Sequence, residues 1–296
     1  MAAVPAKMET GKIVVEIVGG KSTVTRCFSK YPLKFIVPKK IGNSLADAVW
    51  VYSISYGGGI VSGDSISCGF TIGDGCTTVL TTQSSTKVYK SLGSKVSEQN
   101  LEAEIGHNSL FVVVPDPVTC FSTARYSQKQ IFRIASNSSL LLVDWITSGR
   151  IETGEKWDFE MYKSINRIFA EDGQPVFIDS VLLEKGRYSP VSERMQHYQV
   201  LAMVIIMGPR LKHIQDQIQE EVKRMMSHEL LHSPRKTDHF SSKPDFLTSC
   251  SAFGPKGGGG GVVVRIASTT TESVYKFLRH QLANLEPLLG AIPYRI

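Results

Sequence analysis

Two short stretches of this sequence have residue types and spacings that could support catalysis. Ser84 and Lys87, within TTQSSTKVYKS (81–91), stand in the S-x-x-K spacing of a serine nucleophile and its lysine base. Enzymes that use this pair place the serine at the start of a helix, whereas Ser84 lies among the Thr, Val and Tyr residues typical of strands. We therefore interpret this stretch as a strand or bend in which hydroxyl groups bind the backbone.

The second stretch, HELLH from His228 to His232, matches the H-E-x-x-H motif of zinc peptidases. On a helix this spacing places the two histidines one turn apart on the same face, with Glu229 beside a metal-bound water. Pro234 ends the predicted helix soon afterwards, and Arg235 stands where a metzincin has glycine. A zinc-dependent hydrolase that uses His228, Glu229 and His232 is the alternative, enzymatic function.

Three aspartates stand at positions where a carboxylate is unexpected. Asp144 interrupts the apolar run SLLLVDWIT, Asp179 interrupts PVFIDSVLL, and Asp64 closes YGGGIVSGD. Burial of a carboxylate is costly unless it is paired, hydrogen-bonded or lines a wet cavity that a cation can enter. An ion pair is the structural alternative, with Arg150, Lys87 or Arg187 as the candidate partner. A tight turn before Asp64 is permitted by Gly57, Gly58, Gly59 and Gly63.

These carboxylates must be positioned mainly by strands. From Lys12 to about Met207 the sequence consists of short runs rich in Val, Ile, Thr, Phe and Tyr, separated by Gly, Pro, Asn and Asp. The spacing of strands and turns also suits a stacked or helical β architecture. Examples of the predicted strands are residues 12–18, 23–28, 49–55, 65–72, 77–82, 109–115, 130–134, 139–147 and 175–183.

Two amphipathic helices are predicted late in the chain and should pack on a sheet. Apolar residues recur at helical spacing, namely Leu211, Ile214, Ile218, Val222 and Met225, and then Val274, Phe277, Leu278, Leu282, Leu285 and Leu289. The stretch 233–261 between them is polar and ends in five glycines, so we expect a mobile loop. The predicted fold is therefore mainly β with two late α-helices: one domain over 12–290, a flexible N-terminus over 1–11 and a tail over 291–296.

The composition narrows the functional classes. Lys and Arg number 33 against 27 Asp and Glu, an excess of +6, and no long run of like charge marks a nucleic-acid-binding arm. A β-type nucleic-acid binder is therefore the weakest hypothesis. The five cysteines show no C-x-x-C spacing, which favours a reducing, cytoplasmic environment over a disulfide framework or zinc ribbon.

Neither the N-terminal residues nor the longest apolar run indicates a membrane protein. Charges interrupt the N-terminal residues, unlike the apolar core of a signal peptide. The longest apolar run, Val200–Met207, is far shorter than the roughly 20 residues of a membrane-spanning helix. We expect neither a membrane nor a nucleic acid as a partner.

Six sequence blocks occur in a fixed order along the chain: YP (31–32), GGGIVSGD (57–64), TTQSSTKVYKS (81–91), VPDPVTCF (114–121), DWITSGR (144–150) and GEKW (154–157). Together they resemble the UreD family of urease accessory proteins, also called UreH. The resemblance covers most of the chain from Lys12 to about Gly186. HELLH and the five consecutive glycines are not typical of this family.

The resemblance implies a non-enzymatic role in urease maturation. Proteins of this family join UreF and the GTPase UreG in a complex that docks on apo-urease and delivers nickel. The implied fold is a single β-rich, partly helical-β domain with two helices. No permanently bound cofactor is implied, and nickel is expected only in transit.

The resemblance also implies an internal, water-filled path for nickel. The positions that match its lining residues are Asp64, Thr86, Asp144 and Asp179. Ni²⁺ binds carboxylate, hydroxyl and water oxygens more weakly than it binds imidazole or thiolate. A path lined by such oxygens could admit the ion and still release it, as the filters of channels do.

A second set of matched residues is interpreted as structural or as part of interfaces. Lys87 and Tyr89 are expected to hold the geometry around Thr86. Arg150 and Glu155 are expected to form an ion pair across a hairpin. The complete set is Gly58, Gly59, Gly63, Lys87, Tyr89, Arg150 and Glu155.

Overall fold

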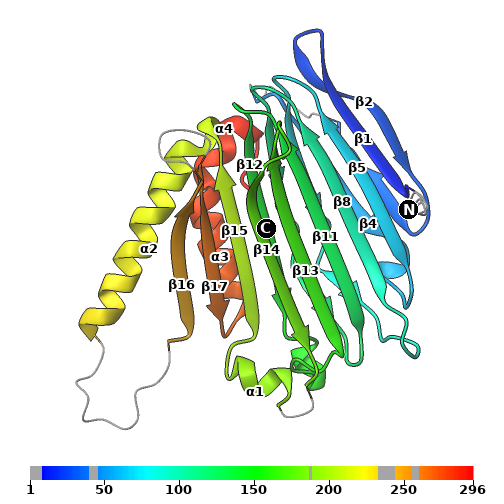
Figure 1. The fold of residues 1–296 in the computed structure, drawn as a ribbon, viewed down its shortest axis with the longest axis vertical. Coiled ribbons are helices and arrows are strands. Elements are labelled where there is room, and N and C mark those ends of the chain that lie inside the picture. Colours follow the sequence, from blue (N-terminus) through cyan, green and yellow to red (C-terminus); the bar gives the residue numbers. More distant parts are fainter. Residues whose placement is uncertain (1–8, 40–45, 187–188, 233–243, 255–259, 296) are drawn as a thin grey trace.

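Two β-sheets face each other, and helices cover part of one of them (Figure 1). The computed structural model describes residues 9–39, 46–186, 189–232, 244–254 and 260–295. Sheet A has seven strands, in the order β14 (Pro175–Glu184), β13 (Met161–Ala170), β11 (Arg125–Ile134), β8 (Ser97–Ile105), β5 (Ser65–Ile72), β1 (Gly11–Val18) and β2 (Lys21–Ser29).

Sheet B has ten strands. Eight of them follow the order β16 (Phe246–Phe253), β17 (Gly261–Ser268), β15 (Val200–Met207), β12 (Ser139–Thr147), β9 (Leu110–Val113), β6 (Thr77–Thr82), β4 (Ala48–Ser55) and β3 (Leu33–Ile36). The short strand β10 (Val118–Cys120) pairs with β12 and with β7 (Thr86–Val88).

The chain winds as a stack of β-coils through much of its length. From β4 to β13 the longer strands alternate between the sheets, and each lies parallel to the strand one coil earlier in its own sheet. Thr77 of β6, for example, pairs with Leu110 of β9. The predicted mainly β, partly helical-β fold in one domain is confirmed.

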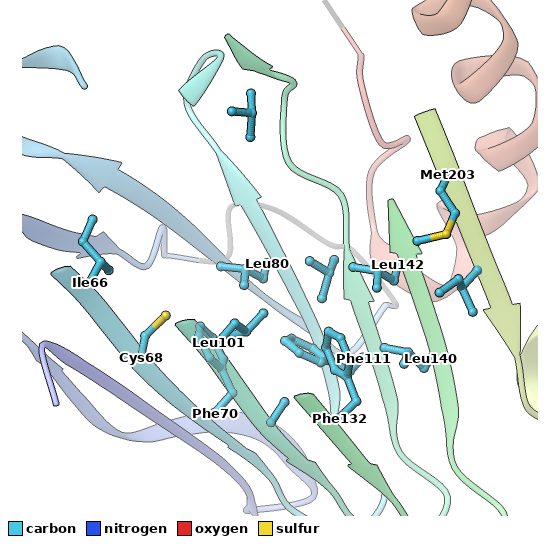
Figure 2. Close-up of a cluster of buried hydrophobic side chains, with 14 of the residues drawn as sticks. Ile66, Cys68, Phe70, Leu80, Leu101, Phe111, Phe132, Leu140, Leu142 and Met203 are labelled. Carbon is cyan, nitrogen blue, oxygen red and sulfur yellow. The ribbon is translucent and has the colours of Figure 1, made fainter. Parts of the chain in front are cut away.

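An apolar core fills the space between the two sheets. In β5 every second residue is buried, including Ile66 and Phe70, because successive side chains of a strand point to opposite faces. Figure 2 shows Phe70, Phe111 of β9 and Phe132 of β11 close together between the sheets. The ring centroid of Phe111 lies 5.5 Å from that of Phe70 and 6.3 Å from that of Phe132.

A second apolar core lies between sheet B and the helices α2 (Lys212–His232) and α3 (Thr271–Leu282). Ile214 and Ile218 of α2 and Leu278 of α3 are fully buried there. The two predicted late helices are therefore confirmed. In Figure 1 both helices lie at the side of the molecule formed by β15, β17 and β16, and β4 lies at the opposite side.

Shorter helical segments complete the chain. A 3-10 turn, Ala283–Leu285, and the helix α4 (Glu286–Leu289) follow α3, so the second apolar series spans three consecutive elements. The five-residue helix α1 (Val191–Met195) precedes β15 and has no clear sequence signal. Among the described residues, no helix combines the length and apolar character that crossing a membrane requires.

The predicted mobile loop over 233–261 is wrong in its central part. Phe246–Phe253 forms β16, which pairs antiparallel with β17 at the edge of sheet B. An edge strand exposes much of its surface, so its Ser, Thr and Cys residues resemble a loop in the sequence. Residues 233–243 and 255–259 lie outside the described part of the chain.

The ends of the described chain are fixed by tertiary contacts. Gly11, predicted to be flexible, begins β1, and Thr10 Oγ1 donates a hydrogen bond to the Ser67 carbonyl (2.8 Å). Near the other end Tyr294 Oη donates to the carbonyl of Pro115 (2.9 Å). The predicted tail is thus anchored at Tyr294, and residues 1–8 and 296 lie outside the described part.

Candidate functional site

A small cavity, here called the inner cavity, lies between the two sheets beside β7. Its volume is about 60 Å³, which suits a few water molecules or an ion, because one water needs roughly 10–15 Å³ on this measure. Its wall is partly apolar and partly polar. The polar and ionisable residues of the wall are Ser53, Cys68, Thr81, Thr82, Thr86, Gln99, Asp116, Gln128, Gln130 and Asp144.

Asp144 of β12 is held by hydrogen bonds from sheet A. Its carboxylate accepts bonds from Gln128 Nε2 (2.6 Å), Ser164 Oγ (2.6 Å) and Asn166 Nδ2 (2.7 Å). Gln130 Nε2 donates in turn to Asn166 Oδ1 (3.0 Å). Within the described part of the chain, these hydrogen bonds come from uncharged donors, so they fix Asp144 in position without an ion pair.

The position of Asp144 changes its proton affinity. It lies deep between the sheets yet keeps some accessible surface, because it lines the inner cavity. Desolvation raises the pKa of Asp144 above its ordinary value, and the three hydrogen bonds oppose that rise. A divalent cation in the cavity would stabilise the ionised carboxylate.

The other polar residues on the wall of the cavity carry mainly oxygen atoms. Thr86 has a hydroxyl group, and the amide oxygens of Gln99 and Gln128 accept hydrogen bonds from Tyr126 Oη (2.9 and 3.3 Å). Cys68 also lines the cavity, but burial raises the pKa of its thiol to about 12. The thiol therefore stays protonated at neutral pH, and a thiolate is the form that binds metals.

Asp179 lies near this network but is neutralised by an ion pair. Asp179 of β14 is the strand partner of Asn166, and its Oδ1 accepts a hydrogen bond from Arg265 Nη2 of β17 (2.7 Å). Its charge contributes to the raised pKa of Asp144. Asp179 does not line the inner cavity, and its ion pair with Arg265 connects the two sheets. Its predicted place on a nickel path stays a prediction.

Asp64 lies outside the cavity in the glycine-rich turn. Its Oδ2 accepts a hydrogen bond from the Val61 N–H (3.0 Å), and its own N–H donates to the Val61 carbonyl (3.0 Å). The carboxylate therefore closes a local turn. Of the four residues predicted to line one path, the structure brings together Thr86 and Asp144, but not Asp64 and Asp179.

The glycine-rich turn is fixed to β7 by backbone hydrogen bonds. The Ile60 N–H donates to the Lys87 carbonyl (2.8 Å), and the Tyr89 N–H donates to the Ile60 carbonyl (2.9 Å). Tyr89 Oη also donates to the Gly57 carbonyl (3.1 Å). A Cβ at Gly59 would lie 2.7 Å from the Lys87 carbonyl oxygen, so only glycine allows this close approach.

Two further glycines allow the turn to close on Asp64. Gly58 has φ of 76° and Gly63 has φ of 84°. This left-handed region is costly for residues that carry a Cβ. The sequence pattern of glycines thus reflects backbone geometry at these positions.

Arg150 and Glu155 form a bidentate ion pair. Arg150 Nε donates to Glu155 Oε2 (3.0 Å), and Arg150 Nη2 donates to Glu155 Oε1. The hydrogen bonds from Arg150 lower the pKa of Glu155. The guanidinium also lies 4.1 Å from the centroid of the Phe121 ring. The pair spans the loop that contains the 3-10 turn Ile151–Thr153, where the Glu155 N–H also donates to the Arg150 carbonyl (3.2 Å).

Comparison with known proteins decides the family. The family model described as UreD urease accessory protein matches residues 9–296. The chain belongs to the UreD family of urease accessory proteins.

Relatives of this UreD-family chain come from plants and bacteria. Urease accessory protein D of Arabidopsis thaliana is 65% identical over 295 residues, which cover 97% of this chain and 100% of the relative. Urease accessory protein D of Oryza sativa subsp. indica is 56% identical over 301 residues, which cover 99% of this chain and 97% of the relative. Urease accessory protein UreD of Sorangium cellulosum is 36% identical over 288 residues, which cover 97% of this chain and 84% of the relative.

These UreD-family relatives are named as accessory proteins and not as enzymes, in agreement with the predicted non-enzymatic role. The names give no support to the zinc hydrolase alternative. The backbone of His228–His232 forms the last turns of α2, and the side chains of His228, Glu229 and His232 lie outside the described part of the structure. In the part that is described, no three or more His, Cys, Asp or Glu side chains gather as a metal site.

Sequence patterns do not single out the residues that hold Asp144 in this UreD-family fold. Gln128 of β11 and Ser164 and Asn166 of β13 are buried polar residues. One signal is available: they are polar residues at alternate positions of strands, where apolar residues are expected to face the core. That pattern indicates an internal polar site but does not reveal which carboxylate it surrounds.

Proposed function

We propose that this chain is a nickel-delivery chaperone in urease maturation. In this role it joins UreF and the GTPase UreG, and the complex docks on apo-urease in the cytoplasm. Family membership and the names of the relatives support a role in urease maturation. The handling of nickel and the identity of the partners are part of the proposal.

The observation that carries the proposal is the position of Asp144 on the inner cavity. The Asp144 carboxylate and Thr86 both line this cavity, and none of the described Arg or Lys residues contacts the carboxylate. Oxygen ligands of this kind hold a divalent transition metal more weakly than imidazole or thiolate. A delivery protein requires such weak binding, because it must release the ion to the enzyme.

The environment of Asp144 also affects how it would bind nickel. Burial disfavours its ionised form and raises its pKa, while the hydrogen bonds from Ser164, Asn166 and Gln128 stabilise that form. A Ni²⁺ ion that reaches Asp144 would further stabilise the carboxylate. Thr86 is proposed as a second oxygen ligand on the same wall.

Two further features support the proposed setting. All five cysteines are free thiols, which suits a reducing cytoplasm. The energy-dependent step is assigned to the GTPase partner, so this chain contributes the scaffold and the path of the ion.

The test is reconstitution of the purified proteins. The chain is combined with UreF, UreG and apo-urease, and complex formation is measured by size-exclusion chromatography with light scattering. GTP and nickel are then added, and urease activity is followed. The proposal predicts entry into the complex and GTP-dependent activation that requires this chain. Failure to enter the complex, or equal activation without the chain, would contradict it.

A further inference from the structure

Among the described residues, the helices leave one end of sheet B without a helical cover. Helices α2 and α3 pack over β15, β16 and β17, and α4 reaches β6 and β4. Trp50 and Tyr52 alternate with the buried Val51 along β4, so they project from the opposite face to that residue, toward the helix side. Trp50 Nε1 donates to the Leu289 carbonyl at the end of α4 (2.8 Å). The covered surface therefore ends beside these two aromatic residues.

A large groove, here called the outer groove, occupies this end of the sheet. Its volume is about 1110 Å³, which exceeds the roughly 300–1,000 Å³ of ordinary small-molecule pockets. Trp50 and Tyr52, with ring centroids 6.4 Å apart, form part of its wall. The start of β2 and residues 37–39 border it as well as the start of α3 and the C-terminal residues. A groove of this size suits an extended segment of polypeptide.

The charged residues of the outer groove are mainly basic. Of the described residues that line it, two are acidic, Asp116 and Glu272, and five are basic, namely Lys21, Lys39, Lys276, Arg279 and Arg295, an excess of three positive charges. Glu272 pairs with Lys276 (2.8 Å), and Asp116 accepts a hydrogen bond from Tyr275 Oη (2.6 Å). This balance favours an occupant with negative charge and at least one apolar side chain for the aromatic wall.

The outer groove adjoins the inner cavity. Thr81, Thr82 and Asp116 line both. The Thr82 Oγ1 accepts a hydrogen bond from the Asp116 N–H (2.8 Å), and Trp145 Nε1 donates to the neighbouring Pro115 carbonyl (2.8 Å). This ordered turn is the wall between groove and cavity, so a segment bound in the groove lies next to the residues that lead toward Asp144.

We propose that the outer groove binds an extended acidic segment of a protein partner, with an apolar or aromatic side chain against Trp50 and Tyr52. The inference rests on the proposed function, because the partner is one of the proteins of the urease-maturation complex. Binding there aligns the partner with the wall shared by the groove and the inner cavity. The basic rim accelerates and orients the association, as complementary charges do at other interfaces.

Charge reversal in the groove tests the proposal. The variant Lys21→Glu/Lys276→Glu changes two exposed residues of the rim. Its matched control, Lys129→Glu/Lys163→Glu, makes the same charge change on the outer face of sheet A, since Lys129 and Lys163 alternate with the inward-facing Gln128 and Ser164. Binding to UreF, UreG and apo-urease is measured separately at two salt concentrations, after circular dichroism has shown that both variants fold.

We expect the groove variant to bind one of these partners at least about tenfold more weakly than the control does, and with less dependence on salt. A photo-crosslinking residue at Gln83, in the wall of the groove, should attach to an acidic segment of that same partner in the assembled complex. The same crosslinker at Lys129 should not.

The outcomes separate this inference from the proposed function. If the complex assembles and activates urease while the groove variant binds every partner as the control does, the groove assignment is wrong and the proposed function stands. Crosslinks from Gln83 to a basic or uncharged segment would also overturn it. If the wild-type chain enters no complex, the proposed function itself fails.

Discussion

Replacement of Asp144 by asparagine should change how stability depends on pH. In the wild type, the folded chain holds a proton on Asp144 above the ordinary pKa of 3.8, because the pKa is raised in the folded state. The unfolded chain loses that proton first. The free energy of unfolding therefore falls as pH rises from 3.8 to the raised pKa, by at most about 1.4 kcal/mol for each pH unit.

The asparagine variant lacks this contribution. A carboxylate accepts hydrogen bonds through two oxygens, whereas an amide has one oxygen and an NH₂ group that only donates. In the variant the NH₂ group would therefore face another donor, such as Asn166 Nδ2. That mismatch costs about 1–3 kcal/mol, but the cost does not vary with pH. The advantage of the wild type over Asp144→Asn should therefore be largest at low pH, decrease through the window and become constant above it.

Urea unfolding of both proteins at a series of pH values measures this difference. Carboxyl groups that do not interact with Asp144 contribute equally to both proteins and cancel in the comparison. Asp172→Asn, a change in an exposed turn where the carboxylate accepts only the Gln174 N–H (3.0 Å), is the control. An advantage of the wild type that increases with pH would refute the reasoning, because it would mean that the hydrogen bonds outweigh desolvation.

Two other substitutions test the glycine-rich turn and the ion pair between Arg150 and Glu155. Gly59→Ala should lower the free energy of unfolding by about 1–3 kcal/mol, because the new Cβ meets the backbone carbonyl of Lys87. The control, Gly69→Ala, should lower it by less, because the Cβ there meets the end of a flexible side chain. Equal losses of stability in urea titrations would contradict the close approach of Gly59 to Lys87. Glu155→Gln removes an acceptor whose folded pKa is lowered by Arg150, so the wild type should be more stable above the ordinary pKa of this carboxyl and lose that advantage as pH falls through the lowered value. A variant as stable as the wild type at neutral pH would show that the ion pair contributes nothing.

The sequence predicts most of the secondary structure because its periodicity is local. The apolar series beginning at Leu211 and Val274 each give a buried helix face, and the apolar runs give strands. The stacking of the β-coils cannot be predicted from local periodicity. The pairing of Thr77 with Leu110, for example, depends on how the whole chain returns after each coil. The strand Phe246–Phe253 is missed because it is an exposed edge strand next to polar, glycine-rich sequence.

The candidate site is predictable only in part for the same reason. Asp144 is recognisable because a carboxylate in an apolar strand must have a special environment. Asp179 has the same local pattern, yet its partner, Arg265, belongs to a strand far along the chain. No spacing rule distinguishes these two environments. Only the packing of one sheet on the other shows that Asp144 faces a cavity and Asp179 an arginine.

The most direct measurement of the central claim is the nickel content of urease after GTP-dependent activation with Asp144→Asn. The wild type, Asp144→Asn and Asp172→Asn are compared at equal concentrations of assembled complex, and nickel is quantified by mass spectrometry of the purified urease. The account predicts that Asp144→Asn assembles normally but loads nickel at least about tenfold more slowly, and that Asp172→Asn loads as the wild type does. Equal loading rates for all three proteins would contradict the claim that nickel passes Asp144.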